Sequence, residues 1–90
     1  IAGPPQRWEA TFGPQDDSAR LARAVVEAAL TKAGVDPAVT TDALLILSEL
    51  VSNAIRHART EYTVSAGVDG GEGSVRLEVF DRDTQQSFVG

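Results

Sequence analysis

What the chain lacks sets the first limits on its function. None of its 90 residues is cysteine, which excludes disulfides, thiolate metal sites and a cysteine nucleophile. No uninterrupted apolar run approaches the roughly 20 residues that span a bilayer, and no signal peptide is visible. We therefore expect a soluble cytoplasmic protein that has no membrane partner.

Clustered basic charge is also missing. Eight Lys and Arg residues face 13 Asp and Glu residues, for a formal net charge of −5, and the basic residues are scattered. Binding to nucleic acid needs a basic face that neutralises phosphates, so no direct nucleic-acid partner is expected. The length and the hydrophobic fraction of 42% fit one small folded domain, or part of one.

Periodicity and turn residues divide the chain into a flexible Pro/Gly arm at 1–7 and a domain over 8–90. The domain is predicted to run strand, helix, helix, strand, strand, at 8–12, 18–33, 37–59, 62–68 and 74–80. The Gly-rich loop "DGGEG" joins the last two strands as a hairpin. The chain ends at "DTQQSFVG" with no clean terminal element, so we expect the domain to be incomplete at its C-terminal end.

Capping residues mark where the two helices begin and end. The first helix has Asp16, Asp17 and Ser18 as N-cap candidates. Gly34 is suited to end this helix. Asp36 can cap the second helix, and Pro37 fits its first position.

The second helix carries an apolar stripe and a polar face. At about 100° per residue, one side gathers the apolar residues Leu44, Leu47, Val51, Ala54, Ile55 and Ala58. The other side gathers Asp42, Glu49, Ser52, Asn53 and Arg56, with His57 at its margin. A solvated face is one interpretation. The apolar residues Leu45, Ile46 and Leu50 lie on or beside this polar face, which instead indicates that a ligand or a lid covers it.

Asp81 continues an apolar row on the last predicted strand. Val75, Leu77 and Val79 share one face of that strand with Asp81. A carboxylate that points toward a core is costly unless it is hydrogen-bonded. Asp81 is therefore either the first residue of the following loop or an acceptor inside a pocket.

Together these segments resemble a known family. "SELVSNAIRHA" is similar to the N box of the histidine-kinase-like ATPases, which have the Bergerat or GHKL fold, and "VRLEVFDRD" resembles the strand that leads to the family's adenine-binding aspartate. The order of elements is most similar to the stand-alone branch of anti-sigma-factor serine kinases. The resemblance implies an α+β fold, a two-layer sandwich with helices on one face of a mixed, mostly antiparallel sheet, that binds ATP and Mg²⁺.

The resemblance also implies roles for individual residues. Asn53 would ligate Mg²⁺, for which an amide oxygen is a suitable ligand. Glu49 would be the general base of phosphoryl transfer to serine. Asp81 would accept a hydrogen bond from the adenine amine, while Asp83 and His57 would also contact the nucleotide. For His57, stabilisation of the helix C-terminus by its charge is the alternative.

Two features depart from the family pattern. The first glycine box of the family is Asp-x-Gly-x-Gly, but residues 81–85 read "DRDTQ" and contain no glycine. The Gly-rich lid and the final strands of the family are also absent from the 90 residues.

The function that the resemblance implies is a regulatory ATP-binding domain. It would be a serine protein kinase that acts on an anti-sigma-factor antagonist and sequesters a sigma factor, and the family resemblance also allows a homodimer. Two alternatives stay open. One is a non-catalytic interaction module that kept the fold, which the missing glycines favour. The other is the ATP-binding core of a sensor histidine kinase.

Overall fold

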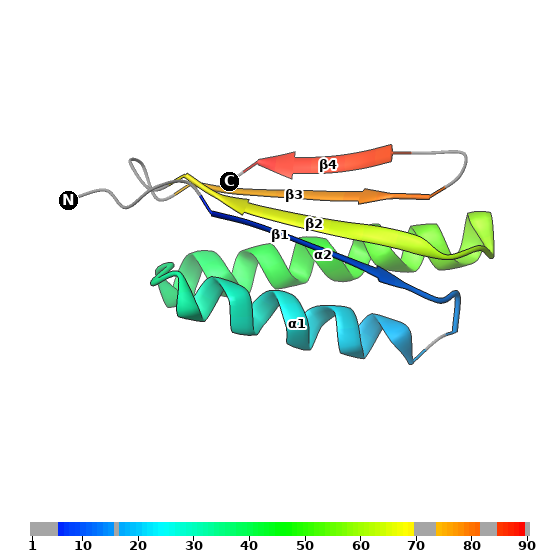
Figure 1. Cartoon of the computed structure of the whole chain (residues 1–90), viewed down its shortest axis with the longest axis horizontal. Coiled ribbons are helices and arrows are strands. Elements are labelled where there is room, and N and C mark those ends of the chain that lie inside the picture. The colour runs from blue at the N-terminus through cyan, green and yellow to red at the C-terminus, as the bar shows by residue number, and fades with distance from the viewer. Residues whose placement is uncertain (1–5, 16, 70–73, 82–84, 90) are drawn as a thin grey trace.

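The computed structural model describes residues 6–15, 17–69, 74–81 and 85–89. Its elements in chain order are β1 (Gln6–Phe12), α1 (Ser18–Lys32), α2 (Pro37–Ala58), β2 (Tyr62–Val68), β3 (Val75–Phe80) and β4 (Gln85–Val89). Figure 1 shows the strands as one layer and both helices as a second layer on one side of it. The expected α+β two-layer architecture is confirmed.

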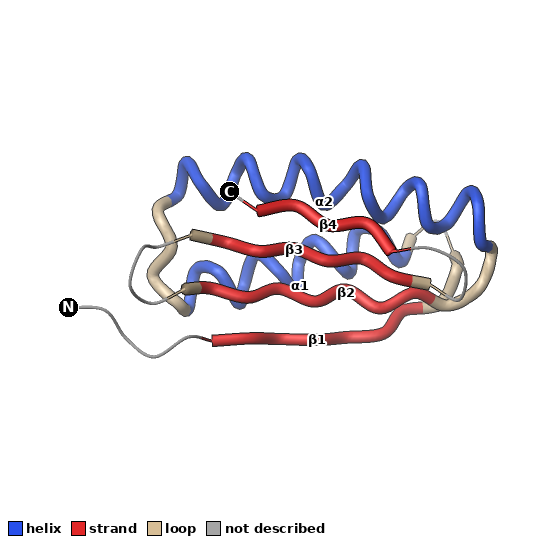
Figure 2. The backbone as a smooth tube through the Cα atoms, turned by 90° about the horizontal axis from the view of Figure 1, so that it is seen from above, coloured by secondary structure: helices blue, strands red, loops and turns tan. Residues whose placement is uncertain are grey.

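The sheet is antiparallel at each described pairing, in the order β1-β2-β3-β4. Strands β1 and β2 are neighbours although both helices lie between them in the sequence, with Trp8 opposite Ala66. Val64 then lies opposite Val79, and Glu78 opposite Ser87. The helix pair covers the face of the sheet, and α2 runs along its β3–β4 side (Figure 2).

The helix boundaries follow from the predicted capping residues. The backbone N–H of Ala38 donates to Asp36 Oδ1 at 2.8 Å, and Pro37 occupies the first turn of α2. Gly34 has a φ of 79°, a conformation that glycine adopts without strain, just after α1 ends. The N-cap of α1 is Asp17, but its side chain makes no capping hydrogen bond. Ser18 bonds to Tyr62 instead.

The core lies between the two layers. Strand β3 shows the expected alternation, because Val75, Leu77 and Val79 are buried beneath the helices. The α2 stripe is confirmed at Leu44, Leu47, Val51 and Ala54, which are buried, while Ile55 is partly buried. The side chain of Ala58 lies outside the described part of the chain.

The first helix buries a narrower side than its periodicity predicts. Ala22, Val26 and Leu30 are buried, whereas Leu21 is 56% exposed and Val25 is 40% exposed. Both exposed residues lie on the flank of α1 toward β1, which pairs only with β2 among the described strands. Periodicity places Leu21 and Val25 on the same broad side of α1 as Val26 and Leu30, but no described element covers the flank on which they lie.

The second helix is unusually apolar. Within the 21 residues Pro37–His57, an 18-residue window reaches a mean hydropathy of 1.4, so by length and composition the helix is able to cross a membrane. The core helix of a soluble protein passes the same test, and 33% of the window is buried here. Since α2 packs on β3 and β4, this property is weak evidence for a membrane span.

The buried hydrogen bond between Ser18 and Tyr62 generates a prediction about alkaline stability. Ser18 Oγ lies 2.7 Å from Tyr62 Oη. Burial raises the pKa of Tyr62 above its usual 10.0, although the Ser18 hydrogen bond partly lowers it. The unfolded chain therefore loses the phenol proton at a lower pH than the folded chain. We expect the free energy of unfolding to fall as pH rises above about 10.

Urea denaturation between pH 8 and pH 11 measures this effect, and Tyr62→Phe is the control. At pH 8 the variant should be less stable by about 1 kcal/mol, because the buried Ser18 hydroxyl loses its partner. Its stability should then decline less with rising pH than that of the wild type. Parallel declines for the two proteins would show that Tyr62 does not cause the alkaline loss.

Candidate functional site

Asn53 lies on the flank of α2 that faces β4. Its side chain is partly buried, and its Nδ2 donates to Gln86 Oε1 at 3.2 Å. Gln86 Nε2 in turn donates to the backbone oxygen of Leu50 at 3.5 Å. The two contacts tie β4 to the middle of α2. This strand is what lies beside Leu50, where the sequence indicated that something covers the helix.

The oxygen of the same amide has a partner from its own helix. Arg56 donates to Asn53 Oδ1 at 2.6 Å from a position three residues later, where side chains of a helix meet. The nitrogen of Asn53 therefore faces the strand and its oxygen faces a cation. Both ends of the amide are engaged.

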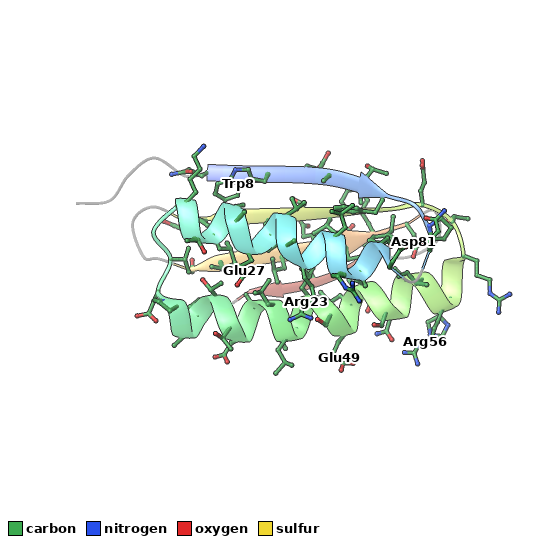
Figure 3. All side chains as sticks on the ribbon, turned by 90° about the horizontal axis from the view of Figure 1, so that it is seen from below. Trp8, Arg23, Glu27, Glu49, Arg56 and Asp81 are labelled. Atoms are coloured by element: carbon green, nitrogen blue, oxygen red, sulfur yellow. The ribbon has the colours of Figure 1, made fainter. Side chains whose placement is uncertain are left out.

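Glu49 is exposed on the outward side of α2. It lines a shallow groove between the two helices with Ala19, Ser52, Ile55 and Arg56. In Figure 3, which views the helix layer with the sheet behind it, Glu49 and Arg56 lie along the lower edge of α2. The row from Glu49 to Asn53 drifts by about 40° around the helix, so the two residues are one turn apart but meet different surroundings.

His57 is exposed in the last turn of α2, next to Arg56. The helix dipole favours positive charge at this end, so His57 is placed to stabilise the C-terminus of the helix. The nucleotide-binding role of His57 stays a prediction.

Asp81 is the first residue after β3 and is half-buried. It lines a hollow with Thr60, Glu61, Thr63 and Phe80. The loop interpretation of Asp81 is confirmed, since the residue directly follows the strand. Its role as an acceptor inside a pocket stays a prediction. Figure 3 places Asp81 at the end of the molecule where α2 ends. The C-terminal ends of α2 and β3 thus lie at the same end of the sandwich.

Two other predicted features concern the ligands. Asp83 lies outside the described residues. Among the residues that are described, no group of three or more His, Cys, Asp or Glu side chains is placed to hold a metal ion. Mg²⁺ usually takes only one or two protein ligands and completes its shell with phosphates and water. The oxygen of Asn53 fits that limited role, so any metal would depend on the nucleotide.

Sequence reasoning missed the contributions of Gln86, Thr60 and Thr63. A strand at 85–89 was not predicted, because Gln-Gln-Ser has little strand preference. Thr60 and Thr63 stand at the junction of α2 and β2 and line the Asp81 hollow. The Thr63 hydroxyl is hydrogen-bonded to that of Thr11, and the Thr60 hydroxyl donates to the backbone oxygen of Glu61. The sequence shows Thr60 and Thr63 only as polar residues beside the start of a strand. Nothing in their spacing predicts that they lie near Asp81.

The comparison with protein families agrees with this arrangement. The family model for the histidine kinase-like ATPase domain matches residues 12–88, which include both helices and the Asp81 end of β3. No curated relative matched the chain. Because the match covers most of the sequence, the chain belongs to the family of histidine kinase-like ATPase domains, which bind ATP.

Proposed function

We propose that the domain binds ATP with Mg²⁺ and acts as a regulator of the anti-sigma-factor type, phosphorylating a serine of an antagonist protein and sequestering a sigma factor. The observation that carries the nucleotide half is the meeting of the α2 end and the Asp81 hollow. The regulatory half is supported by the order of elements, in which β1 leads directly into α1.

The hollow at Asp81 suits an adenine ring. Asp81 supplies a carboxylate acceptor for the exocyclic amine, and Thr60 and Thr63 line the same hollow. Phe80 adds ring surface to the same hollow. A polar hollow lined by two carboxylates, those of Asp81 and Glu61, favours a base that presents a donor there.

The phosphates would lie toward Asn53 and the last turn of α2. Mg²⁺, when bound with the nucleotide, neutralises phosphate charge, and Asn53 Oδ1 is the atom that would hold it. Glu49 would take the proton of the acceptor serine as the serine oxygen bonds to the terminal phosphorus and the bond from that phosphorus to the departing ADP breaks. Its exposed position leaves a second protein room to approach it.

The non-catalytic interaction module is the second candidate function. One observation favours it: both ends of the Asn53 amide are already engaged, by Arg56 and by Gln86. In that case the polar flank of α2 would serve to hold β4 and would not take a nucleotide. Nucleotide titration separates the two functions, because the module should bind neither ATP nor ADP.

Nucleotide choice should depend on Asp81. Guanine presents a carbonyl where adenine presents its amine, so GTP should bind about 10-fold or more weakly than ATP, given the cost of an acceptor that faces an acceptor. Asp81→Ala should lower ATP affinity and bring the two affinities closer together. Isothermal titration calorimetry measures both constants.

A matched control for this test is Asp69→Ala. Asp69 is exposed and follows β2, at the opposite strand end from Thr63, so its removal should leave both affinities unchanged. Equal binding of ATP and GTP by the wild type would remove Asp81 from the adenine site.

Glu49 and Asn53 should fail in different ways. Glu49→Gln keeps the size of the side chain and removes the basic carboxylate, so ATP binding should persist while phosphoryl transfer falls by about 10²-fold or more. Asn53→Ala should weaken Mg²⁺-ATP binding itself. The measurements are nucleotide affinity and phosphate incorporation into an antagonist protein.

Glu27 is exposed on α1, and Glu27→Gln makes the same chemical change there. This control should alter neither nucleotide affinity nor phosphate incorporation. The division of roles would be wrong if Glu49→Gln abolished binding together with transfer. If wild-type protein binds ATP but transfers phosphate to no partner, the kinase half of the proposal fails and ATP binding alone remains.

His57 should matter less than the residues before it. His57→Ala should change nucleotide affinity by about five-fold or less, because an exposed ion contact is weak. Circular dichroism shows whether the variant stays folded. A folded variant that no longer binds nucleotide would place His57 in direct contact with the phosphates.

A further inference from the structure

The Asn53 amide is held with its oxygen toward Arg56. The nitrogen of Asn53 donates to Gln86 at 3.2 Å, and a rotated amide would place an oxygen against the acceptor oxygen of Gln86. The orientation is therefore fixed by β4. The oxygen that remains accepts a hydrogen bond from the Arg56 guanidinium at 2.6 Å, a short charge-assisted contact.

This oxygen is the atom that would ligate Mg²⁺ in the proposed function. Mg²⁺ binds oxygen at close range and demands near-octahedral geometry. A guanidinium on the same oxygen would crowd the ion and repel its charge. Mg²⁺ and the Arg56 guanidinium are therefore two cations that would bind the same oxygen of Asn53.

Resting on the proposed binding of Mg²⁺-ATP at Asn53, we propose that Arg56 competes with the metal for the Asn53 oxygen. Arg56 thereby weakens the coupling between Mg²⁺ and nucleotide binding. In the free domain the Asn53 oxygen accepts a hydrogen bond from Arg56. Mg²⁺ binds this oxygen when the Arg56 guanidinium moves away.

The surroundings of Arg56 allow it to leave. Its side chain is exposed, so the contact with Asn53 is solvated and worth only a few-fold in an equilibrium constant. Arg56 also lines the groove between α1 and α2 together with Glu49. The carboxylate of Glu49 offers an alternative partner on the same face of the helix.

The coupling is a more specific measure than affinity alone. A guanidinium near the phosphates also attracts them, so removing Arg56 would lower ATP affinity with and without metal. Competition for the oxygen affects only the metal-bound state. The ratio of ATP affinity in Mg²⁺ to that in EDTA isolates this effect, and by linkage it equals the effect of ATP on metal affinity.

The experiment compares wild type with Arg56→Met, which keeps an apolar stem and removes the guanidinium. Calorimetric titration with ATP, in Mg²⁺ and in EDTA, should give a ratio that is about two- to five-fold larger for Arg56→Met, the scale of one exposed charged contact. Arg59→Met removes a basic residue just beyond the end of α2 and should leave the ratio unchanged.

A second measurement reads the contact without nucleotide. The side-chain amide signals of Asn53 in a ¹⁵N-labelled NMR spectrum should shift in Arg56→Met and stay in place in Arg59→Met. An unchanged or smaller affinity ratio in Arg56→Met, with ATP still bound, would overturn the competition and leave the proposed function standing. A wild-type domain that binds ATP in neither condition would overturn both.

Discussion

The burial of one stripe of α2 against the sheet determines where the functional residues lie. Leu47 and Val51 are fully buried under the strands, and a helix with two anchored positions has no freedom to rotate about its axis. Each remaining side chain then receives a fixed direction. Asn53 must face β4, and Glu49 must face outward. The arrangement of the site is thus a consequence of core packing, and substitutions that enlarge or empty the stripe would turn the polar flank as well.

Local chemistry allowed most of the fold to be predicted from the sequence. The cap at Asp36 and the bounds of β2 are confirmed because each depends on neighbouring residues. Strand β4 was missed because its residues acquire strand structure only by pairing with β3. The buried side of α1 is also narrower than its periodicity predicts, since the exposure of Leu21 depends on how far the sheet extends. Errors of this kind arise where a tertiary contact decides the outcome.

The candidate site shows the same division. Helix geometry alone places Glu49 and Asn53 on the polar side of α2 and predicts that they lie one turn apart. It gives no information on the partner of Asn53, because Gln86 lies 33 residues away in the sequence on a strand that was not predicted. The apolar row of β3 does not by itself predict this hollow, because Thr63 and Phe80, which also line it, alternate with the buried residues of their strands. Thr60 and Thr63 contribute to the hollow because α2 connects almost directly to β2.

A ligand-binding amide in a small domain faces two opposed requirements. In the free state a partly buried oxygen without a partner destabilises the fold, whereas binding requires that the oxygen be available. A neighbouring arginine on the same helix resolves the conflict, because its contact with Asn53 is short yet exposed. The amide nitrogen donates to Gln86, and this contact ties β4 to α2. In the proposed function the two ends of the Asn53 amide thus have different tasks: the nitrogen holds β4, and the oxygen would exchange the Arg56 guanidinium for Mg²⁺.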